Sequence, residues 1–214
     1  MPNYAQAERQ ALCDTALRIG PDAPTLCDGW TVKDLLAHLA MRERRPEAVG
    51  ILLPQARDLA ERTRARYALR PFEDLVDMVR RGPHEFSPFR IPAVDARANL
   101  QEYFIHHEDI LRAQLPYADE SQVRTVGERL QHSLYAALPA AGTMMLRHSR
   151  MRVAALCPGR TPVALTSPDE PLGEVVIEGL PSEVLLHLAG RMSFVQFAGE
   201  PDDINRFASA PKGI

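Results

Sequence analysis

The feature that most constrains the fold is a run of ionisable side chains in a helix that must also be packed. The stretch "NLQEYFIHHEDILRA", residues 99–113, places Leu100, Phe104 and Leu111 at helical spacing. A neighbouring stripe of the same helix is polar and comprises Asn99, Glu102, His106 and Asp109. If this helix is central in a bundle, the polar stripe faces the interior, where charges are costly unless they are paired or bind a cation.

The candidate partner of this stripe is a histidine on an earlier helix. In "GWTVKDLLAHLAMRERRP", Thr31 is placed as N-cap and Asp34 completes a capping box, and Pro46 ends the helix. His38 lies on the apolar side of that helix. Together with Glu102 and His106 it would supply three metal ligands, the usual number in a catalytic zinc site. Imidazole and carboxylate accept zinc, nickel, cobalt or iron, so the ligand types alone do not select the metal.

The same residues also admit a plainer interpretation. An acid and a histidine four positions apart are common on exposed helices, and His38 alone would be read as a hydrogen-bonded core histidine. His107 falls among the apolar positions, so we expect it to be buried and hydrogen-bonded to the backbone, with a role as a metal ligand as the alternative. Glu108 is expected to be solvated, and His84 to lie in an exposed proline-rich loop.

Composition excludes several classes of function. The net charge of −3 argues against general attraction to nucleic acid or to an anionic membrane. No apolar run approaches the roughly 20 residues that cross a bilayer, and the N-terminus lacks the features of a signal peptide. We therefore expect a cytoplasmic protein. Its cysteines, Cys13, Cys27 and Cys157, are widely spaced without a C-x-x-C and are expected to be unpaired thiols in core or boundary positions.

Hydrophobic periodicity predicts an α+β chain of two domains, a helical bundle over residues 1–149 and a small α/β module over residues 150–214. Asn3 is the expected cap of the first helix. Helices are predicted over 4–19, 32–45, 55–69, 72–81, 95–114, 121–138, 181–191 and 202–208. Strands are predicted over 151–157, 161–166, 173–180 and 193–199, with the first two forming a hairpin.

The two helical segments together resemble the DinB-like metal-binding superfamily, and within it the mycothiol-dependent maleylpyruvate isomerase branch. The pattern is a Gly-Trp before a capped helix with one histidine, followed later by Glu-x-x-x-His. Here it reads Gly29, Trp30, His38, Glu102 and His106. The doubled "HHED" is typical of an actinobacterial subgroup described as metal-binding proteins. The resemblance implies a DinB-like bundle with a four-helix core, and it implies that the last three residues are the metal ligands.

The resemblance also implies roles for two further residues and a chemistry. Asp109 matches a recurrent acid that would orient a ligand imidazole or a water. Arg191, in "LAGR", matches a candidate contact to the substrate or the thiol. The implied cofactor is a divalent metal, zinc before nickel, cobalt or iron, with mycothiol as cosubstrate. The implied partners are a small-molecule thiol and an electrophile, and the implied activity is thiol S-transfer or cis–trans isomerisation.

Two other functions stay open at this point. The chain could be a non-catalytic metal-dependent protein that binds or senses a small ligand. It could also be a degenerate relative whose metal site is only structural. The sequence does not decide between a monomer and a homodimer.

Overall fold

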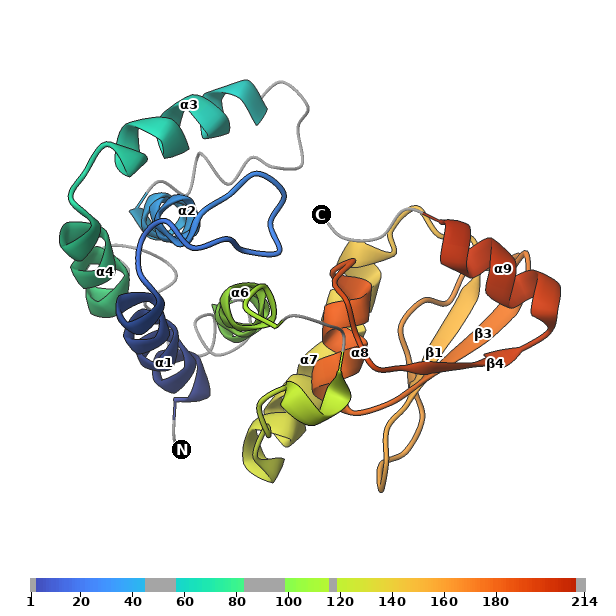
Figure 1. Ribbon diagram of the computed structural model, residues 1–214. Coiled ribbons are helices and arrows are strands. Elements are labelled where there is room, and N and C mark those ends of the chain that lie inside the picture. The colour runs from blue at the N-terminus through green and yellow to red at the C-terminus, as the bar shows by residue number, and fades with distance from the viewer. Residues whose placement is uncertain (1–2, 45–56, 83–98, 116–118, 211–214) are drawn as a thin grey trace. The chain divides into compact units, whose positions relative to one another are not determined.

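The protein divides into two compact units, Met1–Val123 and Arg124–Ile214, in a computed structural model that describes residues 3–44, 57–82, 99–115 and 119–210. The first unit is helical, and the second carries a small mixed sheet with helices (Figure 1). The α+β class expected from the sequence is therefore confirmed. Within the described ranges, no helix combines the length and hydropathy needed to cross a bilayer.

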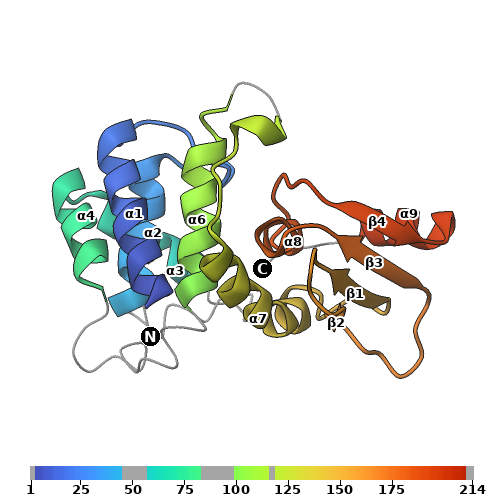
Figure 2. The ribbon, with the colours of Figure 1, turned by 90° about the horizontal axis from the view of Figure 1, so that it is seen from below.

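Helix pairs build the first unit. Its elements are α1 (Tyr4–Ile19), α2 (Val32–Arg44), α3 (Arg57–Ala68), α4 (Phe72–Arg81), α6 (Leu100–Arg112) and the 3-10 turn η5 (Glu120–Gln122). Helix α1 packs against α4 and α6, and α2 packs against α3 and α4 (Figures 1 and 2). Leu12, Leu35, Leu75 and Phe104 are completely buried between these helices.

The predicted starts of the first two helices are confirmed. Asn3 caps α1 by accepting a hydrogen bond from the backbone N–H of Gln6 at 3.1 Å. At α2, the N–H of Asp34 donates to Thr31 Oγ1 at 3.3 Å and the N–H of Thr31 donates to Asp34 Oδ2 at 3.1 Å. This reciprocal capping box fixes where α2 begins, and with it the face on which His38 lies.

The second unit is built around a four-stranded sheet. Its elements are α7 (Glu128–Met145), β1 (Arg152–Leu156), β2 (Val163–Ala164), β3 (Glu174–Glu178), α8 (Pro181–Leu188), β4 (Gln196–Gly199) and α9 (Pro201–Ser209). The strand order is β2-β1-β3-β4, with β1 and β3 parallel and both outer pairs antiparallel. The hairpin expected from the sequence is the β1–β2 pair.

Helix α7 differs from the sequence-based division at residue 149, because it groups with the second unit. It packs against α8 and β2. Gln131 holds it there, since its side-chain amide donates to Ser182 Oγ at 2.9 Å and its carbonyl accepts from the Ser182 N–H at 3.0 Å. The helix also runs past its predicted end, through Pro139. Pro139 lies on the exposed side, where the carbonyl one turn earlier can bond to water.

A buried carboxyl lies in the first unit near the end of α2. Glu43 is 1% exposed, and it accepts a hydrogen bond at 2.5 Å from the hydroxyl of Tyr103. Burial raises the pKa of Glu43 to about 7, although the Tyr103 hydrogen bond and the charges of Arg9 and Arg44 act to lower it. Near neutral pH this carboxyl therefore holds a proton in a large fraction of folded molecules.

We expect Glu43→Gln to remove a pH dependence of stability. The folded protein keeps a proton that the unfolded chain releases near 4.5, so the wild-type free energy of unfolding falls as pH rises from 4.5 to about 7. The variant should lack this fall, which amounts to roughly 3 kcal/mol. Urea unfolding of both proteins at about pH 4.5 and about pH 8 measures the difference. Glu73→Gln, which removes an exposed carboxyl of α4, is the control and should follow the wild type.

Candidate metal centre

Three potential ligand atoms converge between α2 and α6. His38 Nε2 lies 3.3 Å from Glu102 Oε1, and His106 Nε2 lies 3.4 Å from the same oxygen. All three ligand atoms lie within 4.8 Å of one another. Glu102 and His106 are one turn apart on α6, and the capping box of α2 presents His38 to them.

These distances fit a bound divalent ion. An ion held tetrahedrally by nitrogen and oxygen at about 2.0–2.2 Å requires its ligand atoms to be roughly 3.3–3.5 Å apart. The two contacts to Glu102 match that spacing, and a small shift would bring the two imidazoles into range. His38, Glu102 and His106 therefore suit an ion that keeps at least one position open for water or a thiol.

A second group of possible ligands shares His106 and comprises Cys27, His106 and Asp109. Asp109 Oδ2 lies 2.9 Å from His106 Nδ1 and 3.1 Å from Cys27 Sγ, and Sγ lies 3.9 Å from Nδ1. The two contacts to Oδ2 are shorter than ligand–ligand edges and have the length of hydrogen bonds. Metal-binding histidines typically donate a hydrogen bond from one ring nitrogen to a carboxylate and bind the ion through the other nitrogen. His106 has this arrangement, with Nδ1 at Asp109 and Nε2 at Glu102.

The charge of Glu102 is balanced inside the helical core. Arg42 Nε lies 3.4 Å from Glu102 Oε1, and Arg42 Nη1 donates to Asn99 Oδ1 at 2.7 Å. Burial works to raise the pKa of the Glu102 carboxyl. The charge of Arg42 and the hydrogen bonds from the two imidazoles outweigh burial and hold this pKa well below 4.5. Glu102 is thus ionised, as a metal ligand must be.

The two imidazoles are tuned in opposite directions. Burial lowers the pKa of His38 below 6.5, so this ring is neutral near pH 7. Burial acts in the same direction on His106. Hydrogen bonds to Asp109, Cys27 and Glu102 outweigh it and hold the pKa of His106 well above 6.5. In the metal-free protein His106 therefore carries the proton that an ion would displace.

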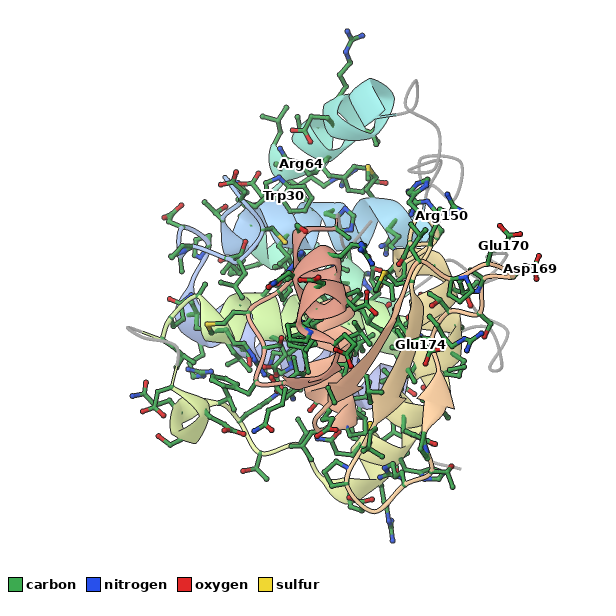
Figure 3. All side chains as sticks on the ribbon, turned by 90° about the vertical axis from the view of Figure 1, so that its right-hand side faces the viewer. Trp30, Arg64, Arg150, Asp169, Glu170 and Glu174 are labelled. Carbon is green, nitrogen blue, oxygen red and sulfur yellow. The ribbon has the colours of Figure 1, made fainter. Side chains whose placement is uncertain are left out.

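The indole ring of Trp30 packs against the imidazole ring of His38. The indole and imidazole centroids are 5.2 Å apart, and the Arg64 guanidinium carbon lies 4.9 Å from the indole centroid (Figure 3). Arg64 is bonded to Glu61 and to Asp34 of the capping box.

The structure gathers most of the residues proposed from the sequence. His38, Glu102, His106 and Asp109 lie together as described above. Arg191 belongs to the second unit, where its Nη1 donates to the carbonyl of Ala189 at 2.9 Å, and its contact with substrate or thiol stays a prediction. The loop that carries His84 lies outside the described residues.

Two expectations about the neighbouring residues on α6 were wrong. His107 is buried, but its ring nitrogens meet side chains of α1, namely Glu8 Oε1 at 2.8 Å and Thr15 Oγ1 at 2.9 Å. Helix α1 thus supplies the partners that the backbone was expected to supply. Glu108 is buried rather than solvated, because it accepts a hydrogen bond at 2.7 Å from Arg112 Nε one turn later.

Sequence reasoning missed two residues next to the centre. Arg42 follows His38 by one helical turn, so the spacing on α2 could have placed it beside Glu102. Cys27 was expected to be an ordinary boundary thiol, and none of the three cysteines forms a disulfide. Nothing in its local spacing indicates the contact with Asp109, since the two residues are 82 positions apart.

Residues 5–88 match the mycothiol maleylpyruvate isomerase N-terminal domain family. Covering 92% of this chain and 90% of the other, the structure resembles the crystal structure of the mycothiol-dependent maleylpyruvate isomerase (16% identity, TM-score 0.49). With the same coverage and identity, it resembles a crystal structure of a histidine-to-alanine mutant of that isomerase with a TM-score of 0.50, which shows a shared fold. No curated protein matches the chain in sequence.

We expect the metal-free protein to lose stability as pH rises above 6.5 because of His106. The folded pKa of His106 is raised, so its stabilising proton is fully present below 6.5 and is lost as pH passes through the folded value. His38, whose pKa is lowered, acts only below 6.5. Unfolding chelator-treated wild type and His106→Gln at about pH 6 and about pH 9 measures this. A difference in unfolding free energy that stays constant between the two pH values would contradict it.

Proposed function

On the premise that residues 5–88 form a domain of the mycothiol maleylpyruvate isomerase N-terminal family, we propose that the protein is a divalent-metal-dependent enzyme acting with a small-molecule thiol. His38, Glu102 and His106 are the proposed ligands. The observation that carries the proposal is the convergence of their three ligand atoms within 4.8 Å, with Asp109 bonded behind His106. A purely structural polar cluster would not need both imidazoles to aim Nε2 at one carboxylate oxygen.

The proposed chemistry is nucleophilic addition by a thiolate. When bound, a divalent metal would lower the pKa of a small-molecule thiol, so that the nucleophilic thiolate is present near neutral pH. If the protein is an isomerase, the thiolate adds to one carbon of a conjugated double bond. The resulting single bond then rotates, and expulsion of the same thiolate restores the double bond. If the protein is a transferase, the thiolate forms a bond to a carbon of the electrophile. The leaving group then departs with the electrons of its bond to that carbon.

The residues of this chain would prepare the site for that chemistry. Arg42 keeps Glu102 ionised, with its Nε 3.4 Å from Oε1, the same oxygen that faces the two imidazoles. Asp109 accepts from His106 Nδ1, which fixes the tautomer whose Nε2 is free to bind. Trp30 packs on the ring of His38 and limits its rotation. Each of the three ligands therefore has a neighbour that restricts its orientation.

The identity of the metal and the thiol is proposed from chemistry and likeness. Two imidazoles and one carboxylate suit zinc, and also nickel, cobalt or iron. The similar solved structures are described as mycothiol-dependent, so mycothiol is the proposed thiol and maleylpyruvate the first electrophile to test. At 16% identity the substrate could differ within the class of electrophiles that react with thiols.

We expect untagged protein purified without chelator to contain about one zinc or nickel ion per chain. His106→Ala should lose that ion, and His132→Ala, which removes an exposed imidazole bonded to Arg160, should keep it. Elemental analysis of the three proteins measures this. Metal-free wild type that binds no divalent ion on reconstitution would overturn the proposed function.

We further expect metal-loaded wild type to accelerate thiol addition by mycothiol, measured as conversion of maleylpyruvate to its trans isomer and, with a generic alkylating agent, as loss of free thiol. His106→Ala loaded under the same conditions should give the uncatalysed rate. His132→Ala should match the wild type. Metal binding without any acceleration would favour the non-catalytic sensor or carrier over the enzyme.

A further inference from the structure

Two hydrogen bonds join the loop between α1 and α2 to Asp109 of α6. The backbone N–H of Leu26 donates to the carbonyl of Asp109 at 3.0 Å. The thiol of Cys27 donates to Asp109 Oδ2 at 3.1 Å. The loop that leads into α2, the helix of His38, is thus bonded to α6, the helix of Glu102 and His106.

One carboxylate oxygen of Asp109 accepts hydrogen bonds from two side chains, Cys27 and His106. Asp109 Oδ2 accepts from the Cys27 thiol and, at 2.9 Å, from His106 Nδ1. Asp109 is completely buried, so the direction of its carboxylate depends on these donors rather than on solvent. Any rotation of that carboxylate would change the direction in which it holds the His106 ring.

Hydrogen bonds within the same loop hold Trp30 in place beside His38. Thr25 Oγ1 donates to the carbonyl of Trp30 at 2.9 Å and accepts from the Cys27 N–H at 3.2 Å. The Thr25 N–H also donates to the Trp30 carbonyl, at 3.1 Å. Trp30 in turn packs on His38, with ring centroids 5.2 Å apart. Displacement of Cys27 would therefore reach His38 through Trp30 as well as His106 through Asp109.

We propose that Cys27 is a positioning residue of the metal centre, whose thiol fixes Asp109 and so aligns the ligand of α2 with the two ligands of α6. This inference rests on the proposed function, because it concerns the same centre. The Cys27 thiol acts as a hydrogen-bond donor to Asp109, and it does not bind the ion. The thiol that reacts with the electrophile is the small molecule, not this side chain.

The test is a Co²⁺ titration of metal-free protein followed by the emission of Trp30. Trp30 is the only tryptophan in the chain and lies beside His38, so an open-shell ion at the centre should quench it. Cys27→Ala and Cys27→Val both remove the donor, and the second keeps most of the volume. Both should weaken Co²⁺ binding by about 10-fold, the lower end of the effect seen for partners of ligand histidines. Cys27→Ser keeps a donor and should stay within about 3-fold of wild type.

A second comparison separates positioning from a general loss of stability. If Cys27 acts through Asp109, the double variant Cys27→Ala/Asp109→Ala should bind Co²⁺ no more weakly than Asp109→Ala alone. Cys13→Ala is the matched control, because it removes a buried thiol of the same unit that meets the carbonyl of Val76 instead. Cys13→Ala should lower stability and leave Co²⁺ affinity unchanged.

Three results would overturn the inference while wild type still binds Co²⁺. Wild-type affinity in both Cys27→Ala and Cys27→Val would show that the thiol positions nothing. Independent, additive losses in the double variant would show that Cys27 does not act through Asp109. A sulfur-to-cobalt charge-transfer absorption that disappears in Cys27→Ser would make Cys27 a ligand. Failure of wild type to bind Co²⁺ at all would instead overturn the proposed function.

Discussion

The centre depends on one physical requirement, which is to keep the Glu102 carboxylate ionised inside a helical core. An unpaired buried charge is expensive, so a chain that places an acid there must surround it with compensating groups. Helix α2 supplies two of them, His38 and Arg42, one turn apart on the face that meets α6. Helix α6 supplies His106 one turn after the acid itself. The register of α2 against α6 is therefore set by polar contacts as well as by the apolar core.

That requirement explains why the fixed start of α2 matters so much. The capping box between Thr31 and Asp34 determines the residue at which the helix begins, and a shift by one residue would turn His38 away by about 100°. Asp34 also binds Arg64, whose guanidinium stacks on Trp30 beside His38. A single acid thus takes part both in starting the helix and in supporting the aromatic ring that braces the ligand.

Local rules were enough to predict much of this arrangement and not enough for the rest. Helical spacing placed Glu102, His106 and Asp109 on one stripe, and the capping box placed His38 on the inner face of its helix. Contacts that join distant segments were missed, because spacing carries no information about them. His107 and Glu8 are 99 positions apart, and Cys27 and Asp109 are 82 apart. Likewise, a helix within residues 121–138 was predicted, but the unit on which α7 packs was not.

The groups bonded to the ligands change the donor strength of His106 and of Glu102 in opposite directions. Asp109 accepts the proton of His106 Nδ1, which makes Nε2 a more basic and stronger donor to a metal. Arg42 shares the charge of Glu102, which makes that carboxylate a weaker donor. A site that lowers the pKa of a thiol benefits from this second effect, because an ion less neutralised by its ligands attracts the thiolate more strongly. The pairing of Glu102 with Arg42 is therefore compatible with the proposed thiol chemistry.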